Sequence, residues 1–324
     1  MPRPALRTIA LLPLAALLVA AAPAAADTFP SKPVRLIVPF PAGGGTDVVA
    51  RVVANGMTAA LGQPVVVENR GGAGGTVGAD AVAKAAPDGY TIGIATSSTH
   101  PAAVVLRKNV PYDPATGFAP IGMIGTTPYI LVSGPKVPAK SLAEFIAWTK
   151  ANPGKVNYAS VGVSTLGYLL SEQLKILTGM DMTHVAYRGA AQAYPDVISD
   201  SVQAFLDNPT GSAGLVRDGQ LRAYAVTAKS AVLPDVPTFA EAGVAGFDTT
   251  FWYGYVAPAG TPPEVVEKLA RAMRDFVRSP AGRAELESKD VTPVGSTPAE
   301  FAATIRADLA RWKTLADRLG IQPE

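Results

Sequence analysis

Eight residues, Phe40 to Asp47 (FPAGGGTD), have the composition of an anion-binding turn. They follow an apolar run typical of a buried strand, Val34 to Val38 (VRLIV), and precede a helical pattern that begins at Val48. Glycine lets the backbone approach a ligand closely and adopt positive φ at little cost. Backbone N–H groups at a helix N-terminus, together with the helix dipole, attract negative charge. The segment therefore predicts a site that holds an anion through main-chain groups.

A second turn of small residues, Ser160 to Thr165 (SVGVST), again joins a strand to a helix. Ligands in α/β sheets bind beyond the carboxyl ends of the strands, so two such turns facing one cleft would hold one carboxylate from both sides. Ser97 and Ser98 lie at the carboxyl end of one predicted strand, and Asp207 ends another. At that place Asp207 either holds a ligand amine or fixes a turn.

These residues also have structural interpretations. Thr46 and Asp47 are residue types that cap helices. Phe40 either packs in the core or covers a ligand. A third glycine-rich turn, Gly71 to Thr76 (GGAGGT), is interpreted as structural, with glycines that provide backbone freedom.

Other chemistry is less well supported. Gly43, Gly45 and Val48, with Glu68 ending the next strand, partly match a dinucleotide-binding fingerprint, although valine replaces its third glycine. An exported dinucleotide-binding enzyme stays open as an alternative. No GK[ST] follows the glycines, which excludes a P-loop. With two histidines and no cysteine in the chain, we expect neither a metal site, nor a catalytic nucleophile, nor a cofactor.

Residues 1–26 have the features of a secretory signal peptide: Arg3 and Arg7, the apolar stretch Ile9 to Ala22, and small residues before a cleavage site near Ala26. Removing the two arginines leaves 26 Lys+Arg (28 − 2) against 26 Asp+Glu. A near-neutral chain lacks the basic excess that nucleic-acid partners or anionic membranes require. Without cysteine, neither a disulfide nor a lipid-modified cysteine can form, so we expect an exported, soluble protein.

Short apolar runs alternate with helical patterns, as in α/β proteins with parallel sheets. We expect helices at Val48 to Leu61 and Leu166 to Leu177, and capping boxes at Ser141 to Glu144, Thr261 to Glu264 and Thr297 to Glu300. The length allows two lobes. The expected strands are Val34 to Val38, Pro64 to Asn69, Tyr90 to Thr96, Val156 to Ser160, Thr183 to Tyr187, Val202 to Asn208 and Leu221 to Thr227.

Four segments resemble the tripartite tricarboxylate transporter substrate-binding proteins, the Bug or TctC family of bacterial periplasmic receptors: KPVRLIVPFPAGGGTD, VVVENRGGAGGTVGADAVAKAAPDGYT, THVAYRG and YVAPAGTP. The resemblance covers essentially the whole mature chain. It implies a two-lobed Venus-flytrap fold, type II-like, with two strands that cross between the lobes near Ile121 to Val132 and Thr249 to Pro258. Lobe 1 would contain residues 27–126 and 251–324, and lobe 2 residues 127–250.

The family has no catalytic activity, so the resemblance implies a monomeric periplasmic receptor that delivers a small carboxylate to a two-component membrane permease. A receptor that docks on a sensor protein stays open as an alternative. The ligand class stays open among aliphatic dicarboxylates, amino acids, nicotinate-like rings and aromatic diacids. A histidine often follows the second loop in the family, whereas Leu166, Gly167 and Tyr168 stand here.

The ligand-binding residues expected from the resemblance and from the strand ends lie in three groups. They are Phe40, Ala42, Gly43, Gly44, Gly45, Thr46 and Asp47 in the first loop, Ser160, Gly162, Val163, Ser164 and Thr165 in the second, and Ser97, Ser98 and Asp207 at strand ends. In both loops we expect backbone N–H groups to face the carboxylate, at about 1.5 to 3 kcal/mol for each hydrogen bond to the ionised group.

Overall fold

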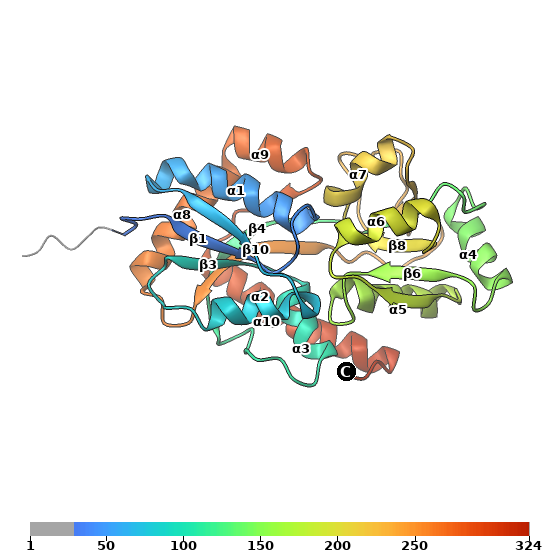
Figure 1. Cartoon of the computed structure of the whole chain (residues 1–324), viewed down its shortest axis with the longest axis horizontal. Coiled ribbons are helices and arrows are strands. Elements are labelled where there is room, and N and C mark those ends of the chain that lie inside the picture. The colour runs from blue at the N-terminus through green and yellow to red at the C-terminus, as the bar shows by residue number, and fades with distance from the viewer. Residues whose placement is uncertain (1–28, 324) are drawn as a thin grey trace, which may run out of the picture.

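Two mixed β-sheets, each with helices on both faces, form the two lobes of the computed structural model, which describes residues 29–323 (Figure 1). The predicted signal peptide and its cleavage site lie outside the described residues. No helix among residues 29–323 is long and apolar enough to cross a membrane.

The first lobe is built on a six-stranded sheet in the order β11, β4, β10, β3, β1, β2. Strand β1 pairs in parallel with β2 and β3, whereas β10 is antiparallel to both β3 and β4. The strands are β1 (Val34–Val38), β2 (Val65–Asn69), β3 (Thr91–Thr96), β4 (Phe118–Thr127), β10 (Phe251–Pro258) and β11 (Thr292–Pro293).

The second lobe is built on a five-stranded sheet in the order β7, β6, β8, β5, β9. Strand β6 is parallel to β7 and β8, and β5 is antiparallel to β8 and β9. The prediction of parallel sheets is therefore wrong for the strands near the lobe junction. The strands are β5 (Ile130–Ser133), β6 (Asn157–Ser160), β7 (Thr183–Ala186), β8 (Ala204–Asp207) and β9 (Arg222–Val226).

Each face of the first sheet buries alternate residues of its strands, as the two-residue period of a strand requires. Leu36 packs in the core under α1 and α8, while its neighbour Ile37 packs with residues of α2 and α10 on the opposite face. Figure 1 shows α1 above the strands and α2 and α10 below them. The helices of this lobe are α1 (Gly45–Leu61), α2 (Thr76–Ala83), α3 (Ala103–Leu106), α8 (Pro263–Arg278), α9 (Pro280–Glu287) and α10 (Pro298–Leu319), with a short 3₁₀ turn, η1 (Ala73–Gly75), and a π-helical turn, η2 (Ser98–Ala102).

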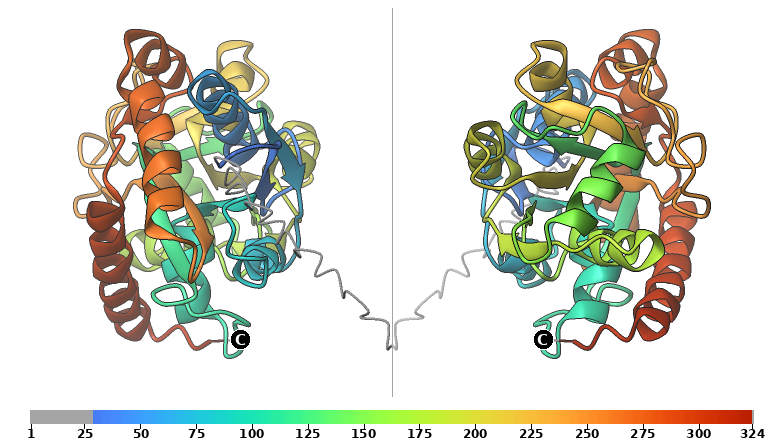
Figure 2. Two further views of the ribbon diagram at one scale, coloured as in Figure 1. Left: turned by 90° about the vertical axis from the view of Figure 1, so that its left-hand side faces the viewer. Right: turned by 90° about the vertical axis from the view of Figure 1, so that its right-hand side faces the viewer.

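The second sheet is covered in the same way. Phe145 and Leu170 from two helices pack on one face, and Val197 and Ala213 from two others pack on the opposite face. Figure 2, on its right, shows the strands of this lobe from the end, between their helices. The helices are α4 (Leu142–Ala151), α5 (Leu166–Thr178), α6 (Ala190–Ser199) and α7 (Pro209–Arg217).

The chain passes between the sheets twice. It leaves β4 at Thr127 and enters β5 at Ile130, and it returns from β9 at Val226 to β10 at Phe251. The long helix α10 then runs back along the junction toward α5 (Figure 1). The lobe boundaries at 126/127 and 250/251 stay a prediction.

The helix starts differ from the predictions in three places. Helix α1 begins at Gly45, three residues earlier than expected, with Gly44 as its N-cap. The capping box predicted at Thr261 to Glu264 is wrong, because Pro262 is the N-cap and the Thr261 hydroxyl donates to the Pro258 carbonyl. The box predicted at Ser141 to Glu144 is only half formed: Ser141 Oγ accepts from the Glu144 N–H, but the Glu144 carboxylate accepts from the Lys140 N–H and not from that of Ser141. The box at Thr297 and Glu300 is confirmed, with both reciprocal hydrogen bonds present.

Candidate functional site

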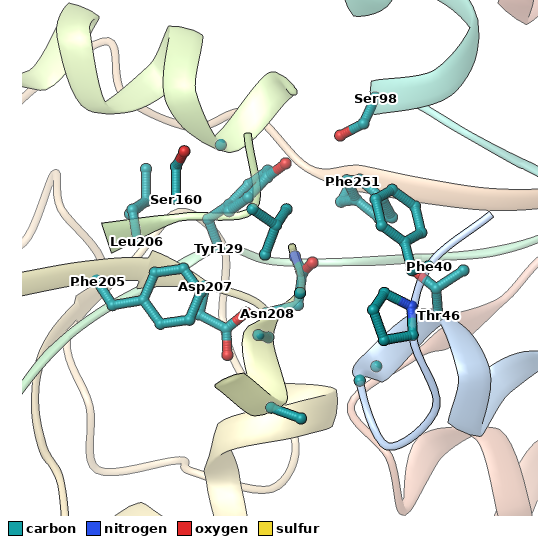
Figure 3. A pocket seen from close by; sticks show the side chains of 18 residues that line it. Phe40, Thr46, Ser98, Tyr129, Ser160, Phe205, Leu206, Asp207, Asn208 and Phe251 are labelled. Atoms are coloured by element: carbon teal, nitrogen blue, oxygen red, sulfur yellow. The ribbon is translucent and has the colours of Figure 1, made fainter. Parts of the chain in front are cut away.

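A cavity of about 60 Å³ lies between the two lobes (Figure 3). At ~10–15 Å³ for each water-sized position, this volume has room for about four to six water molecules, which suits a compact ligand. Seven of the predicted site residues line it: Phe40, Gly44, Gly45, Thr46, Ser98, Ser160 and Asp207.

The first-lobe wall of the cavity is the N-terminus of α1. Gly44 is the N-cap, with extended backbone angles (φ −84°, ψ 166°), and within residues 29–323 α1 has no side-chain cap hydrogen bond. The first N–H groups of a helix have no partner within the helix. Those of Gly45 and Thr46 therefore offer donors, and the positive end of a 17-residue helix, to an anion in the cavity.

Three residues of the first predicted loop, Ala42, Gly43 and Asp47, do not line the cavity. The Gly43 N–H donates to Asp47 Oδ2 at 3.1 Å, and Asp47 also accepts from Asn69 and forms an ion pair with Arg51 at 3.0 Å. Burial acts to raise the pKa of the Asp47 carboxyl, but hydrogen bonds from Arg51, Asn69 and Gly43 hold it below its usual value. Ala42 and Gly43 are exposed, and neither they nor Asp47 line the cavity. Asp47 fixes the loop.

A second uncapped helix N-terminus, that of α6, forms part of the second-lobe wall. Gly189 is its N-cap, without a side-chain hydrogen bond, and Gly189, Ala190 and Ala191 all line the cavity. The two helix N-termini are close: a β-carbon at Gly189 would lie 3.0 Å from Pro41 Cδ, and one at Gly43 would lie 3.8 Å from the Ala191 β-carbon. Donors from both lobes therefore converge on one place.

The second predicted loop, Ser160 to Thr165, is mostly engaged elsewhere. Ser160 lines the cavity, but its hydroxyl accepts from the Gly162 N–H at 3.1 Å and lies 2.6 Å from His184 Nε2. The Ser164 hydroxyl donates to the Ala73 carbonyl of the Gly71 to Thr76 turn, which belongs to the other lobe. Gly162, Val163, Ser164 and Thr165 do not line the cavity, so their contact with a ligand stays a prediction.

The two serines after β3 have different surroundings. Ser97 is fully buried, and its hydroxyl accepts from the Trp252 N–H at 2.9 Å, which holds η2 against β10. Ser98 lines the cavity and accepts from the Leu166 N–H, the first of α5, at 3.1 Å. Ser98 thus joins the first lobe to the second.

Two polar residues at the end of β8, Asp207 and Asn208, complete the second-lobe wall. Asp207 is 8% exposed, and its Oδ2 accepts from the Tyr194 hydroxyl at 2.7 Å. Burial raises the pKa of the Asp207 carboxyl to about 6, against the opposing effect of hydrogen bonds from Tyr194, the Asn208 N–H and Ser212. Figure 3 places both residues opposite Phe40 and Thr46.

The rest of the wall is largely apolar or aromatic, with Phe40 among the lining residues. Phe40 is buried and also lines the cavity, so its contact with a ligand stays a prediction. Sequence reasoning assigned no role to these lining residues: Pro41, Tyr129, Val161, Gly167, Gly189, Ala190, Ala191, Phe205, Leu206, Asn208 and Phe251.

No lysine, arginine or histidine lines this cavity within residues 29–323. Arg188 is exposed and absent from its wall. His100 is buried beside Thr99, and burial lowers its pKa to about 3, so the ring is neutral. Across the same residues, no group of three or more His, Cys, Asp or Glu side chains is placed to hold a metal ion. A bound anion would meet main-chain and hydroxyl donors.

Comparisons with known proteins show the family of this chain. The family model described as "Tripartite tricarboxylate transporter family receptor" matches residues 49–321. The chain belongs to this family. It is 38% identical to Protein BugT of Bordetella pertussis over 304 residues, which cover 93% of each chain.

Two solved structures of similar receptors share the fold. The periplasmic binding protein BugD is 33% identical, with a TM-score of 0.88 over 91% of this chain and 100% of that one. An R. palustris protein solved with adipate is 34% identical, with a TM-score of 0.89 over 91% and 100% of the two chains. The predicted family and its two-lobed α/β fold are thereby confirmed for this tripartite tricarboxylate transporter receptor.

Proposed function

We propose that this protein is an extracytoplasmic solute receptor that closes its two lobes around a small carboxylate. The observation that carries this proposal is the convergence of two uncapped helix N-termini, those of α1 and α6, on one cavity without cationic side chains. Helix N-termini bind anions through N–H groups and the helix dipole. The adipate in the R. palustris relative is a carboxylate ligand of the same kind.

Several contacts link the lobes around the cavity, as expected of a closed receptor. The Leu166 N–H donates to Ser98 Oγ, and Ser164 Oγ donates to the Ala73 carbonyl at 3.2 Å. A ligand that bridges both walls favours the closed state in proportion to its differential affinity for that state. Closure is thus the signal that a partner protein reads.

The receptor delivers its ligand, under this proposal, to a two-component membrane permease of the tripartite tricarboxylate type. Family membership supports that partner. Export through the predicted signal peptide, residues 1–26, and action as a soluble periplasmic monomer complete the proposal. Docking on a sensor protein would use the same closed form, and the neighbouring genes distinguish the two outputs by encoding either a permease or a sensor.

The dinucleotide alternative lacks a supporting observation. Glu68, the acidic residue that its fingerprint requires, forms ion pairs with Arg35 at 3.4 Å and with Arg70, and it does not line the cavity. The two glycines of the fingerprint also differ, since only Gly45 faces the cavity.

Calorimetric titration of the mature chain tests the proposal. The protein is first freed of copurified ligand by unfolding and refolding, and is then titrated with mono- and dicarboxylates, with amino acids, and with nicotinamide dinucleotides. We expect saturable binding of at least one carboxylate, amino acids included, and none of the dinucleotides. Saturable binding of a dinucleotide alone would contradict the receptor function.

A further inference from the structure

The polar groups around the cavity lie in two regions, one rich in hydrogen-bond donors and one in acceptors. Backbone donors lie at the α1 and α6 N-termini. At the end of β8, where Asn208 is the N-cap of α7 and likewise makes no side-chain cap within the described chain, the side chains of Asp207 and Asn208 offer hydrogen-bond acceptors. Figure 3 shows these two residues on the side of the cavity opposite Phe40 and Thr46. A ligand that satisfies both sides therefore needs an anionic group and a separate donor.

Asp207 carries a buried charge without a cationic partner. The titratable groups that face it are the hydroxyls of Tyr129, Tyr194 and Tyr253, and burial raises the pKa of all three, so that they are neutral. Burial raises the pKa of Asp207 itself to about 6, so the residue is mostly ionised at neutral pH. Burying a charge without a cation is costly, and in the described lining no cationic side chain offsets that cost, which only hydrogen bonds from Tyr194, the Asn208 N–H and Ser212 reduce.

The Asn208 side chain presents an acceptor as well. Its Nδ2 donates to the Pro128 carbonyl at 3.1 Å, and a carbonyl oxygen only accepts hydrogen bonds. This contact fixes the amide orientation and leaves Oδ1, an acceptor, on the other side of the amide.

The acceptor end lies close to the α1 N-terminus. The Tyr194 hydroxyl, which donates to Asp207, is also packed against Gly211, and a β-carbon at Gly211 would lie 3.6 Å from the Gly45 nitrogen. The Gly45 nitrogen of the donor region and the Tyr194 hydroxyl that donates to Asp207 thus both lie next to Gly211. A ligand that spans the two regions carries its negative and positive groups only a few bonds apart.

We propose that the ligand is a neutral amino acid whose α-carboxylate binds at the α1 and α6 N-termini and whose ammonium donates to Asp207 and Asn208. Its side chain then contacts the apolar wall formed by Tyr129, Phe205 and Phe251. A second carboxylate on that side chain would meet no cation among the described lining residues. This inference rests on the proposed carboxylate receptor and names its ligand class.

Pairs of ligands that differ only in the amino group test the inference by calorimetry on the ligand-free chain. Suitable pairs are L-valine with isovalerate, L-leucine with 4-methylpentanoate, and L-glutamate with glutarate. We expect the amino member of a neutral pair to bind at least tenfold more tightly than its partner, and more tightly than glutamate. Equal or tighter binding of the desamino members overturns the inference and leaves the receptor function standing. Absence of binding by every member overturns both.

The variant Asp207→Asn sharpens the test. One hydrogen bond between charged groups supports a change of roughly tenfold to one hundredfold, so valine affinity should fall by that factor while isovalerate affinity stays within threefold. Asp218→Asn, an exposed acid at the end of α7, is the matched control and should change neither affinity. Equal losses for valine and isovalerate would contradict a contact with the ammonium.

A measurement on the wild-type chain covers the case in which Asp207→Asn does not fold. Because protonation of Asp207 removes its charge, valine affinity should weaken severalfold between pH 7.5 and pH 5.5, while isovalerate affinity should not weaken. Parallel pH profiles for the two ligands would overturn the assignment of the ammonium to Asp207.

Discussion

The N-termini of α1 and α5 look alike in the sequence but differ in the structure. Both helices follow a strand and a short run of small residues. Helix α1 has Gly44 as its N-cap and no side-chain cap, whereas α5 has Thr165, whose hydroxyl accepts from the Tyr168 N–H. The first N–H of α5, that of Leu166, donates to Ser98. One N-terminus faces the cavity with unused donors, and the other is largely satisfied by the protein.

This difference shows which helix N-termini can bind an anion. Strand, turn and helix provide the geometry, but a ligand can use the N–H groups only where no cap or neighbouring side chain has taken them. Helix α6 supports the same rule, since its N-cap is Gly189, it has no side-chain cap, and its first residues line the cavity. A glycine N-cap leaves the first N–H groups of the helix free for a ligand, whereas the threonine N-cap of α5 accepts a hydrogen bond from one of them.

The largest effect is expected from Gly44→Val. A β-carbon at Gly44 meets no atom within 4 Å, and the backbone is already extended, so valine fits without strain and projects into space that the ligand needs. We expect carboxylate affinity to fall by at least roughly one hundredfold, as steric exclusion from a small site requires. Calorimetry and thermal unfolding measure binding and fold together.

The control for this change is Gly214→Val on α7, where a β-carbon also meets nothing and which does not line the cavity. It should leave affinity unchanged. Retained affinity in Gly44→Val would mean that α1 does not hold the ligand.

The next effect is expected from Ala190→Pro at the first position of α6. Proline is well tolerated there, and the preceding Gly189 is already extended (φ −175°, ψ 159°), so the helix should persist while one N–H is lost. Losing one hydrogen bond to an ionised ligand weakens binding by about tenfold to one hundredfold. Calorimetric titration with the same carboxylate measures the loss, and unchanged affinity would remove α6 from the site.

The two buried aspartates near the cavity, Asp207 and Asp47, should affect protein stability in opposite directions. Asp207 has a pKa of about 6 in the folded protein and 3.8 as its ordinary value, so the folded state is favoured below pH 4 and loses that advantage as pH rises through 6. Asp207→Asn mimics the protonated form, so it should stabilise the ligand-free protein at pH 7.5 by at most roughly 3 kcal/mol. Urea unfolding at pH 4 and 7.5 checks the sign.

Asp47 provides the opposite case. Its pKa is held below 3.8 by Arg51, Asn69 and Gly43, so its contribution to stability is present at neutral pH and is lost as pH falls through the folded-state pKa. Asp47→Asn should therefore destabilise the protein at pH 7.5. If Asp207→Asn and Asp47→Asn changed the free energy of unfolding in the same direction, the distinction between a ligand-facing and a structural aspartate would be contradicted.

The smallest effect is expected from Thr165→Ala, which removes the cap of α5. Loss of a threonine N-cap costs about 1 kcal/mol of stability. Ligand affinity should stay within twofold, because Thr165 does not line the cavity. A large loss of affinity with little loss of stability would restore the second predicted loop as a ligand contact.

Much of the fold was predictable because its signals are local. The apolar run Val34 to Val38 matches β1 at both ends, and the capping box at Thr297 begins α10 as expected. The antiparallel pairing of β10 with β3 and β4 was not predictable, since it depends on contacts between residues more than a hundred positions apart. Local pattern does not encode such pairing.

The candidate site likewise contains residues that the sequence predicts and residues that it does not. The α1 turn was predictable from its glycines, whereas the α6 turn, Gly189 to Ala191, carries the same strand-to-helix signal with fewer glycines and was missed. Tyr129 and Phe251 enter the cavity from the two connections between lobes, so only the tertiary fold brings them together. Gly43 was assigned to the ligand because the hydrogen bond from its N–H to Asp47 cannot be read from a sequence pattern.

A structure of the closed receptor with its carboxylate bound is the most direct test of the account. It should place the carboxylate oxygens about 2.7–3.2 Å from the backbone nitrogens of Gly45, Thr46 and Ala190. A carboxylate held instead by the Val163 and Ser164 nitrogens, or by the Arg188 guanidinium, would contradict the claim that uncapped helix N-termini form this binding site.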